Sequence, residues 1–191
     1  MTRVLPFLGQ RAYLHGTTLF DAMLVHVPAG STISFRIPQR IDSDTVRLQT
    51  LEDSGQTGLA TLAWKCGDRS GTICAVPLPG STRPRRDVYD EGSIRRQLSS
   101  NAGEVTLDTP TPLSFVATLI PLFKALLDQD PRPASPGQWV FSRLDFGYPP
   151  TPFLPVRLRL DARIGGRLAR AAVTAGAECV GHLYFSWASP V

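Results

Sequence analysis

The chain has 191 residues, of which 42% are hydrophobic and 19% charged, and its formal net charge is +4. This length suits one ordinary domain, or two very small ones that share a core, and the composition excludes general disorder. No apolar run approaches the roughly 18–20 residues of a membrane helix. The N-terminal stretch MTRVLPFLGQR is too short for a secretory signal, so we expect a cytoplasmic protein.

Arginine dominates the basic residues, since only Lys65 and Lys124 among the 20 are lysines. The guanidinium group matches phosphate and carboxylate in a bidentate manner. The densest cluster, which acidic residues interrupt, is Arg83, Arg85, Arg86, Arg95 and Arg96. It is either a solvated loop or a docking patch for an anionic partner. A modest charge without a clustered basic face does not favour nucleic acid as a partner.

The three cysteines, Cys66, Cys74 and Cys179, form a sparse set without a CxxC pair. This excludes a disulfide scaffold and offers no metal-binding motif. Cys74 and Cys179 fall in similar strands, which indicates small buried hydrophobic residues rather than nucleophiles. The phosphate-binding pattern GxxxxGK[ST] is also absent, and we expect neither a metal nor a cofactor.

The first half of the chain reads as a helix followed by strands. Residues 17–27 repeat apolar side chains at helical spacing, with Thr17 or Thr18 as the cap and Pro28-Ala29-Gly30 as the stop. Strand-like runs then follow at residues 32–36, 45–51, 59–65 and 72–78. Residues 79–104 are rich in Pro, Gly, Ser, Arg and acids, which predicts a linker with a short helix near residues 93–99.

The second half repeats this order. A helix is expected over residues 112–127, with Thr111 as the cap and Pro112 as its first residue. It is apolar nearly all round, which predicts burial, and Pro121 should kink or split it. Strands are expected at residues 138–146, 156–163, 167–175 and 178–187, with a hairpin turn at Gly165-Gly166.

Short matches between the halves favour an internal duplication over chance similarity. Val46-Arg47-Leu48 corresponds to Val156-Arg157-Leu158, and both halves order one helix before about four strands. An antiparallel sheet that is too short to close on itself curls around the apolar helix and buries it. The sequence therefore predicts an α+β protein of two such units, residues 1–78 and 105–191, joined by residues 79–104.

The helix at Pro112–Leu127, the run Trp139–Phe146 and the hairpin from Val156 resemble the hotdog-fold thioesterase/dehydratase superfamily. The nearest likeness is to A-factor biosynthesis-type and polyketide-dehydratase-type domains, in which two hotdog units stand in tandem as a double hotdog. A single hotdog with an elaborated N-terminal half remains the alternative. The resemblance implies a site between two units, where a pantetheine arm enters and one unit supplies a His and the other an acid.

The stretch Tyr13–Asp21 looks like the His- and Gly-containing start of a dehydratase's first helix, which makes His15 and Asp21 the candidate catalytic pair. A helix N-terminus favours the neutral, basic form of a histidine. The alternatives without catalysis are that His15 is a loop histidine packed on Tyr13 and that Asp21 is an ordinary acid in the first turn of the helix. The sequence departs from the family pattern in two places: Ala12 stands four residues before Gly16, and the second helix has no Asp or Glu.

We therefore expect the chain to bind or convert an acyl thioester on an acyl-carrier protein or coenzyme A, by dehydration, hydrolysis or acyl transfer. Thr17, Arg85 and Arg86 are the candidate substrate-binding residues, because carrier proteins are acidic. One rival is a non-catalytic module of the same fold that binds an apolar ligand or a protein. A second rival is an unrelated β-rich interaction protein. A homodimer is compatible with each.

Overall fold

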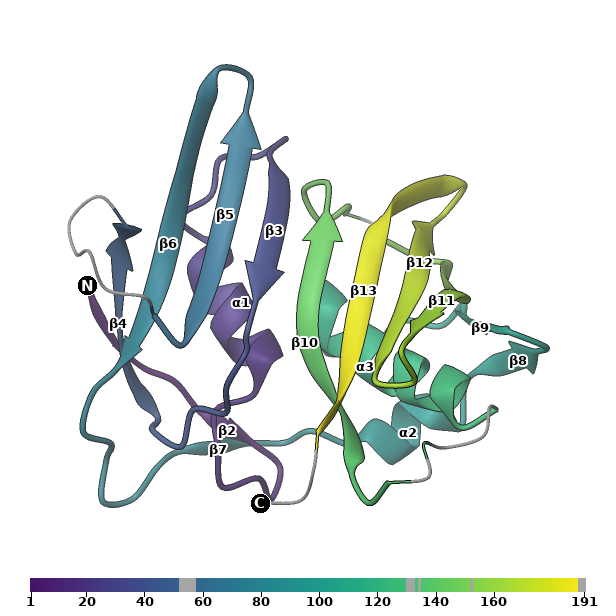
Figure 1. Cartoon of the computed structure of the whole chain (residues 1–191), viewed down its shortest axis with the longest axis horizontal. Helices are drawn as coiled ribbons and strands as arrows, with labels where there is room; N and C mark the ends of the chain where they lie inside the picture. Colours follow the sequence, from purple (N-terminus) through teal and green to yellow (C-terminus); the bar gives the residue numbers. More distant parts are fainter. Residues whose placement is uncertain (52–57, 130–132, 134, 152, 189–191) are drawn as a thin grey trace. The chain divides into compact units, whose positions relative to one another are not determined.

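The computed structural model describes residues 1–51, 58–129, 133, 135–151 and 153–188. It divides into two compact units, Met1–Asp90 and Glu91–Val191 (Figure 1). The division of the chain at residues 78 and 105, with a linker between them, stays a prediction. Of the helices in the described ranges, none is long and apolar enough to cross a membrane.

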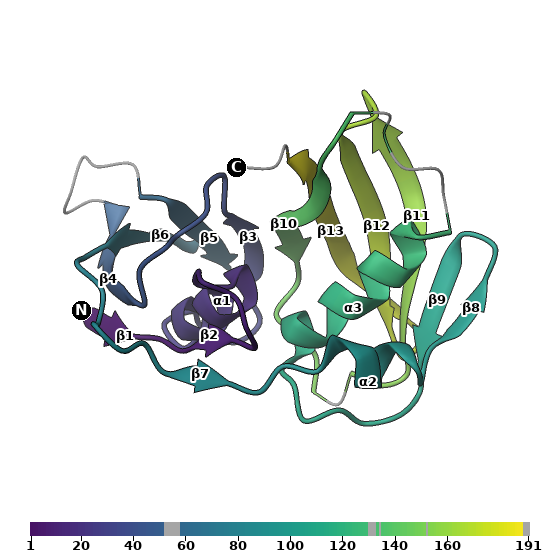
Figure 2. The same cartoon turned by 90° about the horizontal axis from the view of Figure 1, so that it is seen from below.

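The first unit is an antiparallel sheet with one helix against its face. Its elements are β1 (Thr2–Val4), β2 (Phe7–Leu8), α1 (Gly16–Leu24), β3 (Thr32–Arg36), β4 (Thr45–Thr50), β5 (Ala60–Cys66), β6 (Arg69–Pro77) and β7 (Arg86–Asp87). Within this unit the strands of the sheet lie in the order β1-β4-β6-β5-β3, and β2 pairs with β7 in parallel. Figure 2 shows α1 lying along one face of the sheet.

The core of the first unit forms where α1 meets the sheet. Leu19, Phe20 and Met23 of the helix are fully buried, as are Phe35 and Leu62 of the strands. The rings of Phe20 and Phe35 meet edge to face, with 5.5 Å between their centroids. Edge-to-face contact is the preferred geometry of an aromatic pair, so it stabilises this helix position beyond the burial of apolar area.

The helix α1 begins and ends earlier than the sequence indicated. Its N-cap is His15, whose side chain makes no capping hydrogen bond, so the predicted cap at Thr17 or Thr18 was wrong. The helix ends at Leu24, because the amides of His26 and Val27 turn back to the carbonyls of Met23 and Leu24 at 3.0 and 2.9 Å. Such tight bonds close a helix and direct the chain away from its axis.

The second unit repeats the arrangement of helix against sheet. Its elements are α2 (Glu91–Arg95), β8 (Ser99–Asn101), β9 (Glu104–Leu107), α3 (Phe115–Leu127), β10 (Gln138–Phe146), β11 (Val156–Ile164), β12 (Leu168–Ala175) and β13 (Glu178–Ala188). Its strands lie in the order β10-β13-β12-β11-β9-β8. In Figure 2, α3 crosses the face of this sheet and α2 lies beside α3.

The helix α3 is buried on nearly every side, as its sequence predicted. All of its residues are buried except Lys124 and Ala125, which are partly exposed. Pro121 lies inside the helix, which stays a single element, so the predicted split does not occur. The predicted cap was also wrong: the Ser114 hydroxyl accepts from the amide of Ala117 at 3.3 Å. The hydroxyl of Thr111 instead pairs with that of Thr118 at 2.9 Å.

The two units differ in how their strands are connected. In the first unit the last strand of the antiparallel sheet, β6, lies between β4 and β5. In the second unit the last strand, β13, lies between β12 and β10. The matched triplets in β4 and β11 do share one burial pattern, with Val and Leu buried and Arg exposed between them. The paired cysteines do not match, because Cys74 is buried and Cys179 is exposed, so the expected burial of Cys179 was wrong.

A buried carboxylate, Asp44, fixes the start of β4. Its Oδ1 accepts from the amide of Ser81 at 2.8 Å and from the hydroxyl of Thr45 at 3.1 Å. Burial by itself would raise the pKa of Asp44, but these hydrogen bonds favour the charged form and hold the pKa below its usual value. The ionised carboxylate therefore anchors the chain that follows β6 to the sheet.

We expect Asp44→Asn to destabilise the protein by about 1–3 kcal/mol at pH 7, since a neutral amide oxygen accepts these two bonds less strongly than a carboxylate does. A lowered folded pKa stabilises the fold above the unfolded value of about 3.9, and this contribution is lost as the pH falls through the folded pKa. Urea unfolding of both proteins should show the gap closing below about pH 4. Asp42→Asn, at an exposed position, is the control, and a gap that persists in acid would contradict the assignment.

Candidate functional site

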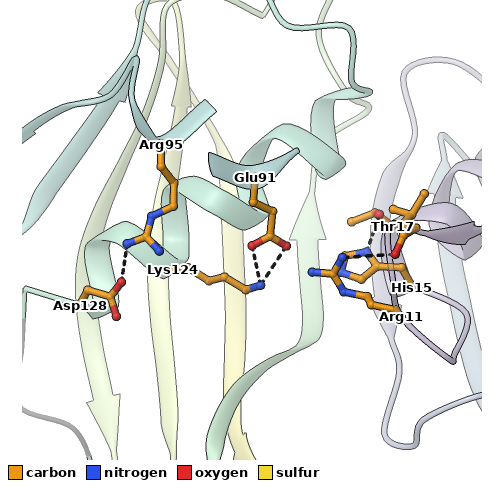
Figure 3. A network of polar contacts seen from close by, with 8 residues as sticks. Arg11, His15, Thr17, Glu91, Arg95, Lys124 and Asp128 are labelled. Carbon is orange, nitrogen blue, oxygen red and sulfur yellow. Dashed lines mark hydrogen bonds and ion pairs between the residues drawn. The ribbon is translucent and has the colours of Figure 1, made fainter. Parts of the chain in front are cut away.

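His15 is a buried histidine at the N-terminal end of α1. Only 7% of its surface is exposed, and its Nδ1 lies 2.8 Å from Oγ1 of the fully buried Thr17 (Figure 3). The backbone is extended at His15 and becomes helical at Gly16, which turns the imidazole back toward the first turn. Thr17 therefore fixes the orientation of the imidazole ring.

Tyr89 packs on His15 and was not among the residues that the sequence analysis selected. The two ring centroids are 5.5 Å apart with the planes tilted by 47°, and Tyr89 is 8% exposed. The Arg11 guanidinium covers the Tyr89 ring at 5.0 Å from its centroid, a cation–π geometry. Tyr89 thus supplies a ring contact to His15, and the packing of His15 on Tyr13 stays a prediction. The feature of the sequence that could have identified Tyr89 is that it is an aromatic residue in a segment otherwise rich in charged residues.

Arg86 holds the chain that leads to His15. Its Nη1 donates to the carbonyl oxygens of Gly9 at 3.1 Å and Arg11 at 2.6 Å, and its guanidinium lies over the Phe7 ring. These contacts join segments about 75 residues apart in the chain, beside the parallel pairing of β2 with β7. Arg85 is exposed and pairs with Asp87 at 3.0 Å. The proposed binding of substrate by Arg85 and Arg86 stays a prediction.

Arg86→Ala should cost about 1 kcal/mol of stability, because two hydrogen bonds from a charged donor are lost, and they lie at an exposed position where solvent weakens them. It should also raise amide hydrogen exchange over residues 9–12, next to the carbonyls that it holds. Arg85→Ala is the matched control, since an exposed ion pair contributes little. Equal exchange in the two variants would show that Arg86 does not position this segment.

Asp21 lies on α1 and is half-buried. It follows Thr17 by four residues, so the two side chains share one face of the helix. The pairing of Asp21 with His15 stays a prediction. The remaining histidines lie elsewhere: His26 is exposed just past the end of α1, and His182 lies on β13 with its Nε2 3.4 Å from Asp161.

The charged residues of the second unit form ion pairs at α2 and α3. Lys124, the charged residue of α3, is held by both carboxylate oxygens of Glu91 at 2.8 and 3.0 Å (Figure 3). Arg95 pairs with Asp128 at the other side of α2. These ion pairs fasten α2 to α3, so one arginine of the predicted basic cluster has a structural role. The helix α3 carries no carboxylate of its own.

Comparison with known proteins identifies a similar fold but no family. No family model matches the chain, and no curated protein does. A dehydratase domain from the CurJ module of the curacin polyketide synthase is similar in structure, with a TM-score of 0.50 and 12% identity over 95% of this chain and 85% of that one. A dehydratase-cyclase domain of ambruticin biosynthesis gives a TM-score of 0.49 and 14% identity, covering 93% of this chain and 83% of that one.

A thioesterase II-type protein from Thermobifida fusca gives a TM-score of 0.43 and 11% identity, covering 94% of this chain and 88% of that one. Sequence identities this low show a similarity of fold and nothing more. The comparison of folds rests on the curacin dehydratase domain. In each unit of our chain an antiparallel sheet lies against a helix whose sheet-facing side is buried. The chain is an α+β protein of the hotdog fold, with two hotdog units in tandem.

Proposed function

We propose that this protein binds acyl thioesters, carried by an acyl-carrier protein or by coenzyme A, and acts on them by dehydration, hydrolysis or acyl transfer. The observation that carries the proposal is the oriented, buried His15 at the start of a hotdog helix. A buried histidine tied to a neighbouring hydroxyl is a suitable general base. The similar fold of a dehydratase domain supports the same class of substrate.

In this proposal His15 is the general base, and Thr17 orients its ring through Nδ1. For a 3-hydroxyacyl thioester, the base takes the proton from the carbon next to the thioester carbonyl. The β-carbon–oxygen bond then breaks, and the hydroxyl leaves as water after it receives a proton from an acid. Asp21 is our candidate for that acid. Because general acid–base catalysis typically contributes 10²–10⁴-fold, each group should have a measurable effect.

Docking of the carrier is the second part of the proposal. Arg83 and Arg85 are exposed, and carrier proteins present an acidic surface. Such charges mainly raise the association rate, and their effect weakens as salt rises. Arg83→Ala together with Arg85→Ala should therefore raise KM for a carrier-bound substrate and leave KM for a free pantetheine thioester unchanged.

The test is native mass spectrometry of the purified chain with a panel of 3-hydroxyacyl, enoyl and saturated acyl pantetheine thioesters. Binding followed by loss of water from the 3-hydroxyacyl compound, or release of free pantetheine, supports catalysis and identifies the reaction. If no member of the panel binds or changes, on free pantetheine or on a carrier protein, the proposal is wrong.

A non-catalytic binding module is the second candidate, and one observation favours it. The helix α3 has no Asp or Glu that could act as an acid from the second unit. This candidate predicts complexes with thioesters that persist without chemical change. Overnight incubation with the same panel, read by mass, separates the two functions.

A further inference from the structure

The sheet of the first unit is longer than the helix that covers it. Both α1 and β6 have nine residues. A helix rises 1.5 Å per residue and a strand about 3.3 Å, so α1 spans about 14 Å and β6 about 30 Å. Figure 1 shows the β5–β6 hairpin extending past α1. The part of the sheet beyond the C-terminal end of the helix is therefore left without a helical cover.

A cleft with a volume of about 750 Å³ lies at this place. Its apolar wall is formed by Leu48, Leu51, Ala63, Trp64 and Ile73. Pockets that hold small molecules usually measure about 300–1,000 Å³ and are mostly apolar with a few polar groups, so the size and the wall are those of a ligand site.

Trp64 owes its position in the wall to a glycine. Trp64 and Gly71 face each other across β5 and β6, and a Cβ on Gly71 would lie 2.9 Å from the indole ring. Only glycine allows the ring to lie flat on the neighbouring strand. The arrangement presents the large aromatic surface of a half-buried tryptophan to the cleft, where a planar or chain-like apolar molecule can stack on it.

The polar groups of the cleft are His26, Gln49, Thr50, Ser70 and Thr72. By the strand register, Gln49, Ser70 and Thr72 lie on the face of the sheet opposite to Trp64 and Ile73, so His26 and Thr50 are the polar groups on the side of the aromatic wall. Of the lining residues that the structure describes, none is a lysine, an arginine or a carboxylate. A charged group would find no opposite charge among them and its desolvation would be costly, so these residues favour an uncharged ligand.

The cleft is separate from the His15 site. His15 precedes α1, whereas His26 of the cleft follows it, so the two sites lie at opposite ends of the helix. Between these ends, Leu19, Phe20 and Met23 are completely buried in the packed core. We therefore propose that the first unit has a second binding site, at the C-terminal end of α1, for a small uncharged apolar molecule with a hydrogen-bonding group.

The test uses Trp64 as the reporter and N-phenyl-1-naphthylamine, an uncharged aromatic amine, as the probe. The other two tryptophans, Trp139 and Trp187, lie in the second unit, so W139F/W187F leaves Trp64 alone. Titration should quench Trp64 emission and raise probe emission in a saturable manner with a Kd in the micromolar range. The wild-type chain, followed by probe emission, covers the case in which the double variant fails to fold.

Two variants localise the binding. Thr50→Phe places a ring in the cleft opposite Ile73 and should weaken probe binding at least tenfold. Thr32→Phe adds the same ring at an exposed strand residue outside the cleft, and should bind like the parent. Linear, non-saturable emission in the wild type, or equal affinity in the two phenylalanine variants, would overturn the proposal. Because His15 is not involved, probe binding without thioester turnover would leave this site standing and the proposed function refuted.

Discussion

His15→Ala is expected to lower kcat for thioester turnover by about 100-fold or more, the contribution that a general base usually makes. The alanine removes the imidazole that Thr17 holds at 2.8 Å at the start of α1. Substrate binding should change little, because the base contributes mainly in the transition state. The measurement is kcat and KM for the thioester that the mass-spectrometric panel identifies.

Two further variants separate chemistry from structure. Thr17→Val keeps the shape of the buried side chain and loses its hydroxyl, so it should lower kcat less than His15→Ala and change the pH profile of kcat. His182→Ala removes a histidine of the second unit and should leave kcat unchanged. If His15→Ala retains the turnover of the wild type while folding normally, His15 is not the base, and the mechanism proposed here is wrong.

Gly181→Ala should destabilise the second unit by about 3 kcal/mol or more, among the largest effects of any single substitution in this chain. Gly181 lies in β13 with φ of +142°, a conformation that other residues rarely adopt. A Cβ there would lie 2.1 Å from the carbonyl oxygen of Asp145 and 2.8 Å from Cα of Phe146. Both are backbone atoms of β10, which pairs with β13, so they cannot retreat without loss of that pairing.

Gly166→Ala is the matched control for this substitution. Its φ is +67°, also in the left-handed region, but a Cβ would meet nothing within 4 Å. Its free energy of unfolding should fall only by the cost of holding a residue with a Cβ in the left-handed conformation, about 1–2 kcal/mol. Urea unfolding followed by the fluorescence of Trp139 and Trp187, on the two strands concerned, measures both variants. A cost at Gly181 no larger than at Gly166 would show that β10 adapts to the added methyl group.

The sequence predicted the strands well because their signal is local. In β11 the alternation of Val156 and Leu158 with Arg157 matches the two-residue repeat of a strand with one buried face, and the structure buries these residues accordingly. The strands at residues 32–36 and 138–146 have the predicted bounds. The all-round apolar character of α3 likewise predicted a buried helix, since no arrangement with an exposed face would be stable.

The candidate site was predictable only in part. His15 and Thr17 are two residues apart, so their proximity follows from the local turn into α1. Tyr89 is more than 70 residues away and reaches His15 because β7 pairs with β2 and Arg86 binds the carbonyls of Gly9 and Arg11. A contact of this kind depends on the path of the whole unit, and no periodicity in the sequence records it.

The sequence by itself determined the two helix-and-sheet units and which faces of their elements are buried, because hydrophobic periodicity is a property of neighbouring residues. The tertiary structure decided the caps, the strand order and the cleft. Thr111 is as good a cap residue as Ser114, and only packing selects between them. The position of β6 between β4 and β5 is likewise set by pairing across the sheet. A strand taken alone can form its backbone hydrogen bonds with any of several neighbours, so its sequence does not determine which one it pairs with.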